Sequence, residues 1–206
     1  RQQSNWKHEE SELKDPNNRL FWKFNRRRLD AEAIRDSVLA VSGRLNPEHY
    51  GLPVFPPLPG NIAETVKYTD SKWHTQSGPL GRKRSIYIYQ QRTLTMPFMQ
   101  TFDALVCDES RPKRQRSVTP LQALSMYNGD FVNTESLHFA RLIQKACDND
   151  PNQQIHHSFQ RALSRDPTEE ETDTLLRFMA DQPSNDQALI GLCRILYNSN
   201  EFLYID

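Results

Sequence analysis

The sequence of 206 residues contains little cysteine and glycine, and this excludes several kinds of functional site. Its three cysteines, Cys107, Cys147 and Cys193, are far apart and form no Cys-x-x-Cys pair. The chain therefore contains neither a zinc ribbon nor a c-type haem attachment motif. Its seven glycines form no phosphate-binding loop, and no Gly-x-Ser-x-Gly elbow is present. We interpret Cys147 and Cys193, late in predicted helices, as buried apolar side chains; one disulfide stays open as an alternative in an exported protein.

Long hydrophobic runs are also missing. No apolar run approaches the roughly 18 residues that a membrane-spanning helix needs. The hydrophobic fraction of 36% is low, although 10% aromatic residues can still supply a core. The chain begins Arg-Gln-Gln-Ser-Asn, without methionine or an apolar signal region. We therefore expect it to be a piece of a longer protein.

Formal net charge is zero, but the charges are unevenly distributed. Residues 82–116 carry eight Lys and Arg against three Asp and Glu, whereas residues 117–206 carry six against thirteen. Two interpretations stay open. The basic middle and the acidic end attract each other within one fold, or the basic stretch faces an anionic partner.

The N-terminal half predicts one long helix between irregular segments. Residues 1–20 are polar and predict an arm, with a turn at residues 15–18. A helix starts at Asp30 as N-cap, continues through residues spaced as Ile34 and Val38, and stops at Gly43. Five prolines in residues 46–60 predict an extended segment that wraps the core. Residues 85–90 predict a short strand with a partner in residues 60–76 or at the C-terminal tail.

The last ninety residues predict a bundle of short amphipathic helices. Thr119-Pro120 and Thr168 mark two helix starts, each with Gln or Glu three residues after the cap. Further helices are expected at about 133–147, 152–163 and 185–197. The predicted fold is mainly α: a C-terminal helical bundle, a Pro-rich wrapping segment and one small β element. Residues 21–206 are expected to form one domain.

Candidate anion-binding residues surround the predicted strand and precede the cap at Thr119. Arginines beside a helix N-terminus can bind sulfate, phosphate or carboxylate. An anion or a glycan is the expected ligand; nucleic acid is disfavoured, because no known nucleic-acid motif frames Tyr87 and Tyr89. The candidate residues are Arg82, Arg84, Arg92, Arg111, Lys113, Arg114 and Arg116.

A second cluster of charges lies at the start of the first long helix. Its members are spaced for ion pairs, which indicates a structural role, with an active-site arginine–carboxylate set as the alternative. The alternative is a glycan-active enzyme that uses Asp30, Glu32, Arg35 or Asp103. The six histidines show no spacing typical of a metal site, so no metal is expected. The structural ion-pair cluster is predicted to comprise Arg28, Asp30, Glu32, Arg35 and Asp36.

Four segments together resemble a known family. They are residues 25–46 (with Arg-Arg-Arg-Leu-Asp-Ala-Glu-Ala-Ile-Arg-Asp), 84–103, 117–132 (with Thr-Pro-Leu-Gln-Ala-Leu) and 198–204. The chain resembles the planctomycete-specific domain one (PSD-one) family, a domain of unknown function, over nearly everything after Arg19. Family members often carry a cysteine just before the basic run, where this chain has Arg111.

The resemblance implies a C-terminal portion of a larger exported, extracytoplasmic protein. It implies upstream domains as partners, haem c in that upstream part, and a genetic context of sulfatases and polysaccharide use. It supplies no catalytic residues. The function expected is an accessory or binding module of an exported cytochrome c-associated protein. The alternatives are a glycan-active enzyme and a purely structural docking domain for a haem domain, which would expose an apolar patch.

Overall fold

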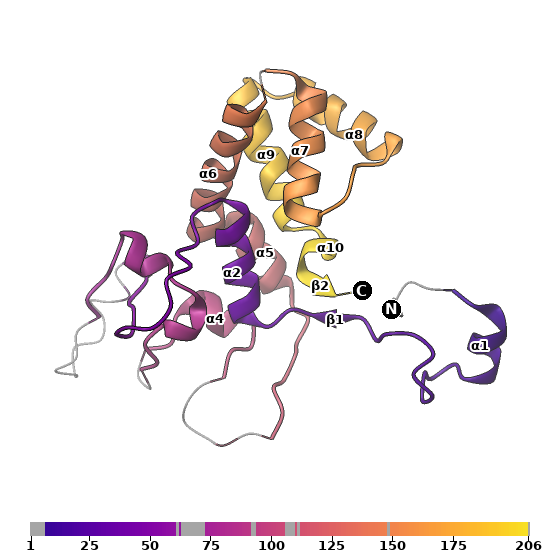
Figure 1. The fold of residues 1–206 in the computed structure, drawn as a ribbon, viewed down its shortest axis with the longest axis horizontal. Coiled ribbons are helices and arrows are strands. Elements are labelled where there is room, and N and C mark those ends of the chain that lie inside the picture. The colour runs from indigo at the N-terminus through magenta and orange to yellow at the C-terminus, as the bar shows by residue number, and fades with distance from the viewer. Residues whose placement is uncertain are drawn as a thin grey trace.

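The described part of the chain is mainly helical, with one small sheet, as predicted. The computed structural model describes residues 7–60, 62, 73–91, 94–105, 110, 112–147 and 149–205. Figure 1 shows a helical body from which an N-terminal arm extends. The elements described are α1 (Glu9–Lys14), β1 (Arg27–Arg28), α2 (Ala31–Val41), the 3-10 turns η1 (Pro79–Arg82) and η2 (Ser85–Tyr87), α4 (Pro97–Thr101), α5 (Pro120–Asn128), α6 (Asp130–Ala146), α7 (Pro151–Leu163), α8 (Glu169–Ala180), α9 (Asn185–Tyr197), α10 (Asn200–Leu203) and β2 (Tyr204–Ile205).

Helices α6 to α9 form the predicted bundle, with α9 packed against α6, α7 and α8 (Figure 1). Local signals start these helices. The Asp150 carboxylate accepts from the amide of Asn152, and the Thr168 hydroxyl accepts from the amide of Glu171 in a capping box. Cys147 and Cys193 are buried free thiols, as predicted; Cys107 lies outside the described residues. Helix α6 begins at Asp130, three residues before the predicted start, because Gly129 alone separates it from α5.

Helix α2 joins the bundle to the rest of the body. It begins after Asp30 and is followed by Gly43 at φ +74°, as predicted. Its last turn is held by the bundle: the Tyr197 hydroxyl donates to the Val38 carbonyl at 3.1 Å, and Arg161 Nε donates to the Val41 carbonyl at 2.6 Å. The Val41 carbonyl is one of those that a helix end leaves without intrahelical partners, whereas the Val38 carbonyl also accepts from the amide of Ser42.

The predicted strand at residues 85–90 is wrong. Ser85–Tyr87 forms the 3-10 turn η2, and Ile88 makes only an isolated bridge to Val54, in the Pro-rich segment. The sheet lies elsewhere: the C-terminal β2 pairs antiparallel with β1, with Arg28 opposite Tyr204. The Pro-rich segment itself wraps the core as predicted, since Phe55 and Leu58 pack partly buried against it.

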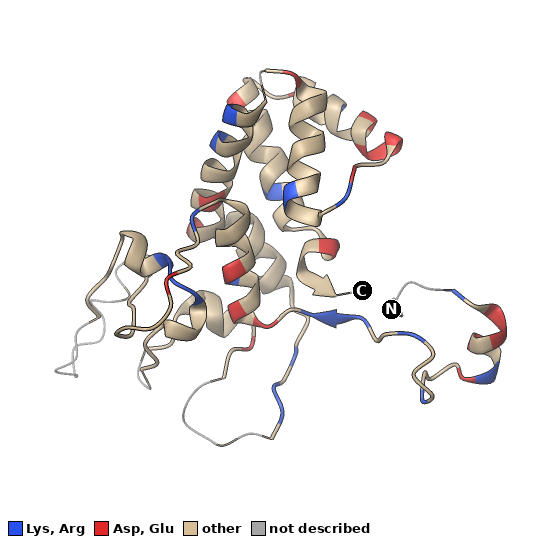
Figure 2. Cartoon of the chain, in the orientation of Figure 1, with Lys and Arg blue, Asp and Glu red and all other residues tan. Residues whose placement is uncertain are grey.

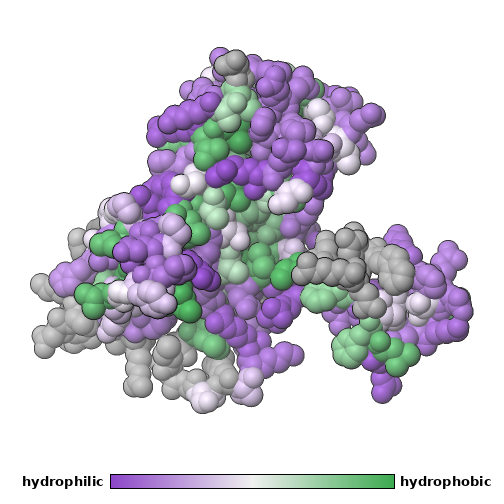
Figure 3. All heavy atoms as spheres, in the orientation of Figure 1, coloured by the Kyte–Doolittle hydropathy of each residue, from purple (hydrophilic) through white to green (hydrophobic). Residues whose placement is uncertain are grey.

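The N-terminal arm contains a short helix, α1, which the sequence did not reveal. The expected turn at residues 15–18 is present, and the buried carboxylate of Asp15 accepts from the amides of Arg19 and Leu20 at 2.9 and 2.7 Å. Leu20 and Phe21 of the arm are exposed to solvent, and Figure 3 shows hydrophobic residues at the surface of the arm. A domain boundary at residue 20 stays a prediction.

An ion-pair clamp at the start of α8 predicts a measurable pH dependence. Arg165 donates to Glu171 at 2.7 Å and to Glu201 at 2.7 Å. The hydrogen bonds from Arg165 lower the pKa of Glu171 to about 2. Because this pKa is depressed, the stabilisation is present above the ordinary value of 4.5 and is lost as pH falls toward about 2.

We expect Glu171→Gln to lower the free energy of unfolding at neutral pH by at most about 1 kcal/mol, since the pair is partly exposed to solvent. Gln can still accept the capping bond from Thr168. The difference from the wild type should vanish near pH 2, which urea unfolding at both pH values will check. Glu170→Gln is the matched control; an equal loss in both variants would contradict a role for the clamp.

Candidate functional site

The two charge clusters identified in the sequence bind each other. Arg114 makes a bidentate pair with Glu32, at 2.6 and 2.9 Å, and Arg116 donates to Asp30 at 3.0 Å. The basic stretch before α5 therefore lies along the acidic start of α2 (Figure 2). The Asp30 side chain makes no capping bond to its own helix. The ion pairs that the described residues of the basic middle make go to Asp30, Glu32, Asp36 and Glu48, and none goes to the acidic C-terminal half.

One helical turn further along α2, Arg35 and Asp36 hold the segment around η1 and η2. The Arg35 side chain is 2% exposed and donates to the carbonyls of Gly81 at 2.7 Å and Lys83 at 3.1 Å. Asp36 accepts from the amide and the hydroxyl of Ser85 at 2.8 and 2.7 Å. Burial lowers the pKa of Arg35 to about 10, so the guanidinium stays charged at neutral pH.

The remaining candidate anion-binding residues have different environments. Arg84 is half exposed, 3.8 Å from Asp36, and Arg82 lines a cavity described below. Lys113 lies in an open depression of about 600 Å³ together with Arg114 and Arg116. Arg92 and Arg111 lie outside the described residues. Because Glu32 and Asp36 are one helical turn apart, α2 brings the two basic stretches to one face and compensates part of their charge.

A third set of contacts fixes the start of α5. Arg28, 4% exposed, donates to the Asp103 carboxylate at 2.6 Å. Asp103 also accepts from the amide and hydroxyl of Ser117 at 2.7 and 2.8 Å. Gln122 of α5 donates to the Ser117 hydroxyl at 3.1 Å. This chain of bonds joins β1, the end of α4 and α5.

These contacts weaken the enzyme alternative. The carboxylates of Asp30, Glu32 and Asp103 are each held by an arginine. The fourth residue of that alternative, Arg35, is occupied by backbone carbonyls. A glycosidase needs two carboxyl groups facing one substrate, whereas each of these three carboxylates faces an arginine.

Helix α5 and Val118, two residues before it, carry a row of exposed large apolar side chains, which we name the α5 stripe. Its members recur every third residue, at Val118, Leu121, Leu124 and Tyr127, and are 78%, 60%, 53% and 50% exposed. Spacing of this kind usually marks a buried helix face. The sequence contains the signal, but spacing alone cannot distinguish a core face from an unpartnered one.

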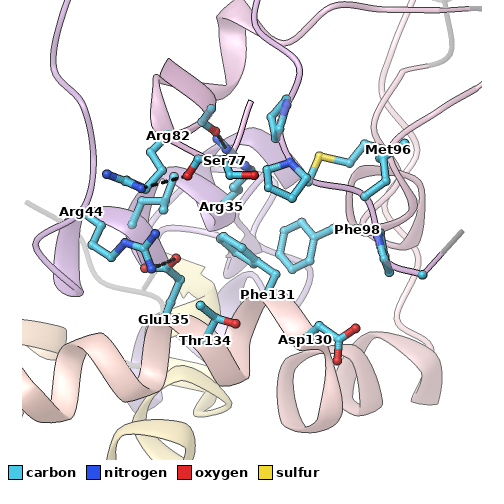
Figure 4. Close-up of a pocket in the computed structure, with 17 residues that line it drawn as sticks. Arg35, Arg44, Ser77, Arg82, Met96, Phe98, Asp130, Phe131, Thr134 and Glu135 are labelled. Atoms are coloured by element: carbon cyan, nitrogen blue, oxygen red, sulfur yellow. Dashed lines mark hydrogen bonds and ion pairs between the residues drawn. The ribbon is translucent and has the colours of Figure 1, made fainter. Parts of the chain in front are cut away.

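A cavity of about 260 Å³ lies between α2, α6 and the Pro-rich segment. Figure 4 shows Arg44, Arg82 and Glu135 on one side of it, Met96 and Phe98 on the other, and Phe131 between them. Its lining comes from segments far apart in the sequence, so no local motif could have revealed it.

Comparison with known proteins gives a family. A family model described as PSD1, protein of unknown function (DUF1553), matches residues 1–179. The chain belongs to the PSD1 family. The matched range differs from the resemblance seen in the sequence. It includes the residues before Arg19, and it ends before the segment at 198–204. Searches of curated proteins and of solved structures gave no significant match.

The PSD1 family has no known function, so membership assigns no reaction or ligand to this chain. In the part of the chain that the structure describes, no group of three or more His, Cys, Asp or Glu could hold a metal ion. Across the same residues, no helix is both long and apolar enough to cross a membrane.

The buried Arg28–Asp103 pair should matter much more to stability than the exposed pair between Asp30 and Arg116. Asp103→Asn keeps the side-chain shape but leaves the buried Arg28 charge without a carboxylate partner, so we expect a loss of about 3 kcal/mol in the free energy of unfolding. Asn also tolerates the φ of +60° at this position. Asp30→Asn, the matched control, should cost less than about 1 kcal/mol. Denaturant unfolding measures both; equal losses would contradict the assignment.

Proposed function

We propose that this chain is an accessory, non-catalytic module of a larger exported protein, and that the α5 stripe docks against another domain of that protein. The observation that carries the proposal is the stripe itself. Three large apolar side chains at least half exposed on one helix, with Val118 just before it, exceed the scattered single exposures that are normal on a soluble surface.

The surroundings of the stripe favour docking because they hold it rigid. The Arg28–Asp103–Ser117–Gln122 contacts fix the start of α5. At the other end, Arg194 lies over the Tyr127 ring at 4.9 Å and donates to its carbonyl at 3.0 Å. A preorganised helix face loses little conformational entropy on binding. Insertion of such a face into an apolar groove, with anchors spaced along one side of the helix, is a common mode of recognition.

The partner follows from the family resemblance given above. We propose an upstream domain of the same extracytoplasmic, planctomycete-type protein, with haem c carried by that upstream part. The present chain contains no Cys-x-x-Cys-His sequence, so its own residues do not fit covalent haem attachment and no redox role is proposed for it.

Charge placed on the stripe should abolish docking without unfolding the module. We expect the double change Leu121→Glu, Leu124→Glu to weaken binding to the separately expressed upstream part at least about tenfold, because charged groups would be desolvated at the contact. Titration calorimetry measures the affinity, and circular dichroism checks the fold. Leu52→Glu, at a residue 85% exposed outside α5, is the control. Unchanged affinity in the double variant would rule out docking through the stripe.

A second candidate function is contact with an anionic polysaccharide. It is favoured by Lys113, which is exposed in the depression beside Arg114 and Arg116. Such binding would be electrostatic and would weaken steeply with salt.

Arg114 and Arg116 form ion pairs at the start of α2, so replacing them with alanine would also disturb the fold. Lys113→Glu therefore tests polysaccharide contact more directly. We expect it to reduce the retardation of the protein by dextran sulfate in affinity electrophoresis at low salt. Lys145→Glu, on α6 away from the depression, is the charge-matched control. Retardation that is absent in the wild type, or equally reduced in both variants, would remove this candidate.

A further inference from the structure

The cavity between α2 and α6 has one apolar and one charged end. Apolar side chains form one wall of the cavity. Its rim reaches the surface at Pro57 and Pro59, which are exposed. Phe98 and Phe131 stand edge-to-face with ring centroids 5.2 Å apart, so they present flat apolar surface to the cavity. The other apolar lining residues are Leu39, Pro56, Leu58 and Met96.

The charged end holds one arginine, Arg82, that is not paired with a carboxylate in the described part of the chain. Glu135 is paired with Arg44 at 3.3 Å and accepts from the Ser42 hydroxyl at 2.7 Å. Arg82 donates only a long bond, 3.3 Å, to the Ser77 carbonyl, and its buried Nε has no partner. Arg35, which also lines the cavity, lies 3.8 Å from Asp36, and Asp130 lines the cavity as well. Among the described residues, Arg82 is thus the lining arginine that has no carboxylate partner.

One further observation supports an unfilled demand for an anion. Arg35 also lines the cavity, and its buried Nε has no hydrogen-bond partner; buried donors of this kind are rare in folded proteins.

We propose that this cavity binds a small apolar monocarboxylate, with the carboxylate against Arg82 and Arg44 and the apolar body between Phe98, Phe131 and the proline wall. Guanidinium groups pair with carboxylates through short, charge-assisted hydrogen bonds. One arginine without a carboxylate partner matches a monoanion better than a phosphate dianion. The apolar wall, within about 260 Å³, excludes a polysaccharide chain. This site is separate from the α5 stripe and does not depend on the docking proposal.

The test uses 3-phenylpropionate as the probe and the methionine methyl groups as local reporters. Met96 lines the cavity, whereas Met126 and Met179 are buried and do not line it. In spectra of the protein with labelled methionine methyls, we expect the Met96 signal to shift saturably with probe concentration and those of Met126 and Met179 to stay in place. The uncharged analogue 3-phenylpropanamide and the dianion phenyl phosphate should both bind at least about tenfold more weakly.

Paired variants separate the site from general surface charge. Arg82→Gln should weaken 3-phenylpropionate binding at least about tenfold, while Arg84→Gln, at the half-exposed arginine two residues away and outside the cavity lining, should change it less than twofold. Should Arg82→Gln fail to fold, Thr134→Phe, which fills the cavity from α6, must abolish the Met96 shift. The proposal is overturned if Met96 does not respond well above about 1 mM probe, if the amide or phenyl phosphate binds equally well, or if both arginine variants lose affinity equally.

Discussion

The buried guanidinium of Arg35 is the contact on which the N-terminal half of the body depends. It lies on α2 and binds the carbonyls of Gly81 and Lys83, in a segment that has almost no regular structure of its own. A charge removed from water in this way must keep all its partners, because losing one leaves a buried donor uncompensated. Asp36, next in sequence, binds the same segment through Ser85. Neighbouring residues of opposite charge thus determine where some ten residues of irregular chain are placed.

The same helix receives contacts from the bundle and from the loop before α5. Glu32 and Asp30 form ion pairs with the arginines of that loop. The carbonyls of the last turn of the helix accept hydrogen bonds from Tyr197 and Arg161. Helix α2 is therefore the common support of the cavity, of the α5 stripe and of the bundle. The crowding of charges at residues 26–36, which in the sequence suggests either chemistry or ion pairing, is used here largely for ion pairing.

The sequence predicted the elements whose signals are local and missed those that depend on distant contacts. Helices α7, α8 and α9 begin within a residue of the predicted positions, because caps such as Thr168 act within one turn. The strand expected at residues 85–90 does not form, because the amide of Ser85 donates to the Asp36 carboxylate and is not free to pair with a neighbouring strand. The pairing of Arg114 with Glu32 joins residues 82 positions apart, and no pattern in the sequence indicates such a partner. The cavity was missed for the same reason, since its walls meet only after folding.

The pairing of β1 with β2 has a consequence for how the module is attached to anything else. Arg28 lies opposite Tyr204, so the chain enters the body and leaves it at one place. The arm that precedes Arg27 and the C-terminal β2 therefore meet the body side by side, so a pull applied between them would load this short ladder before it loaded the helices.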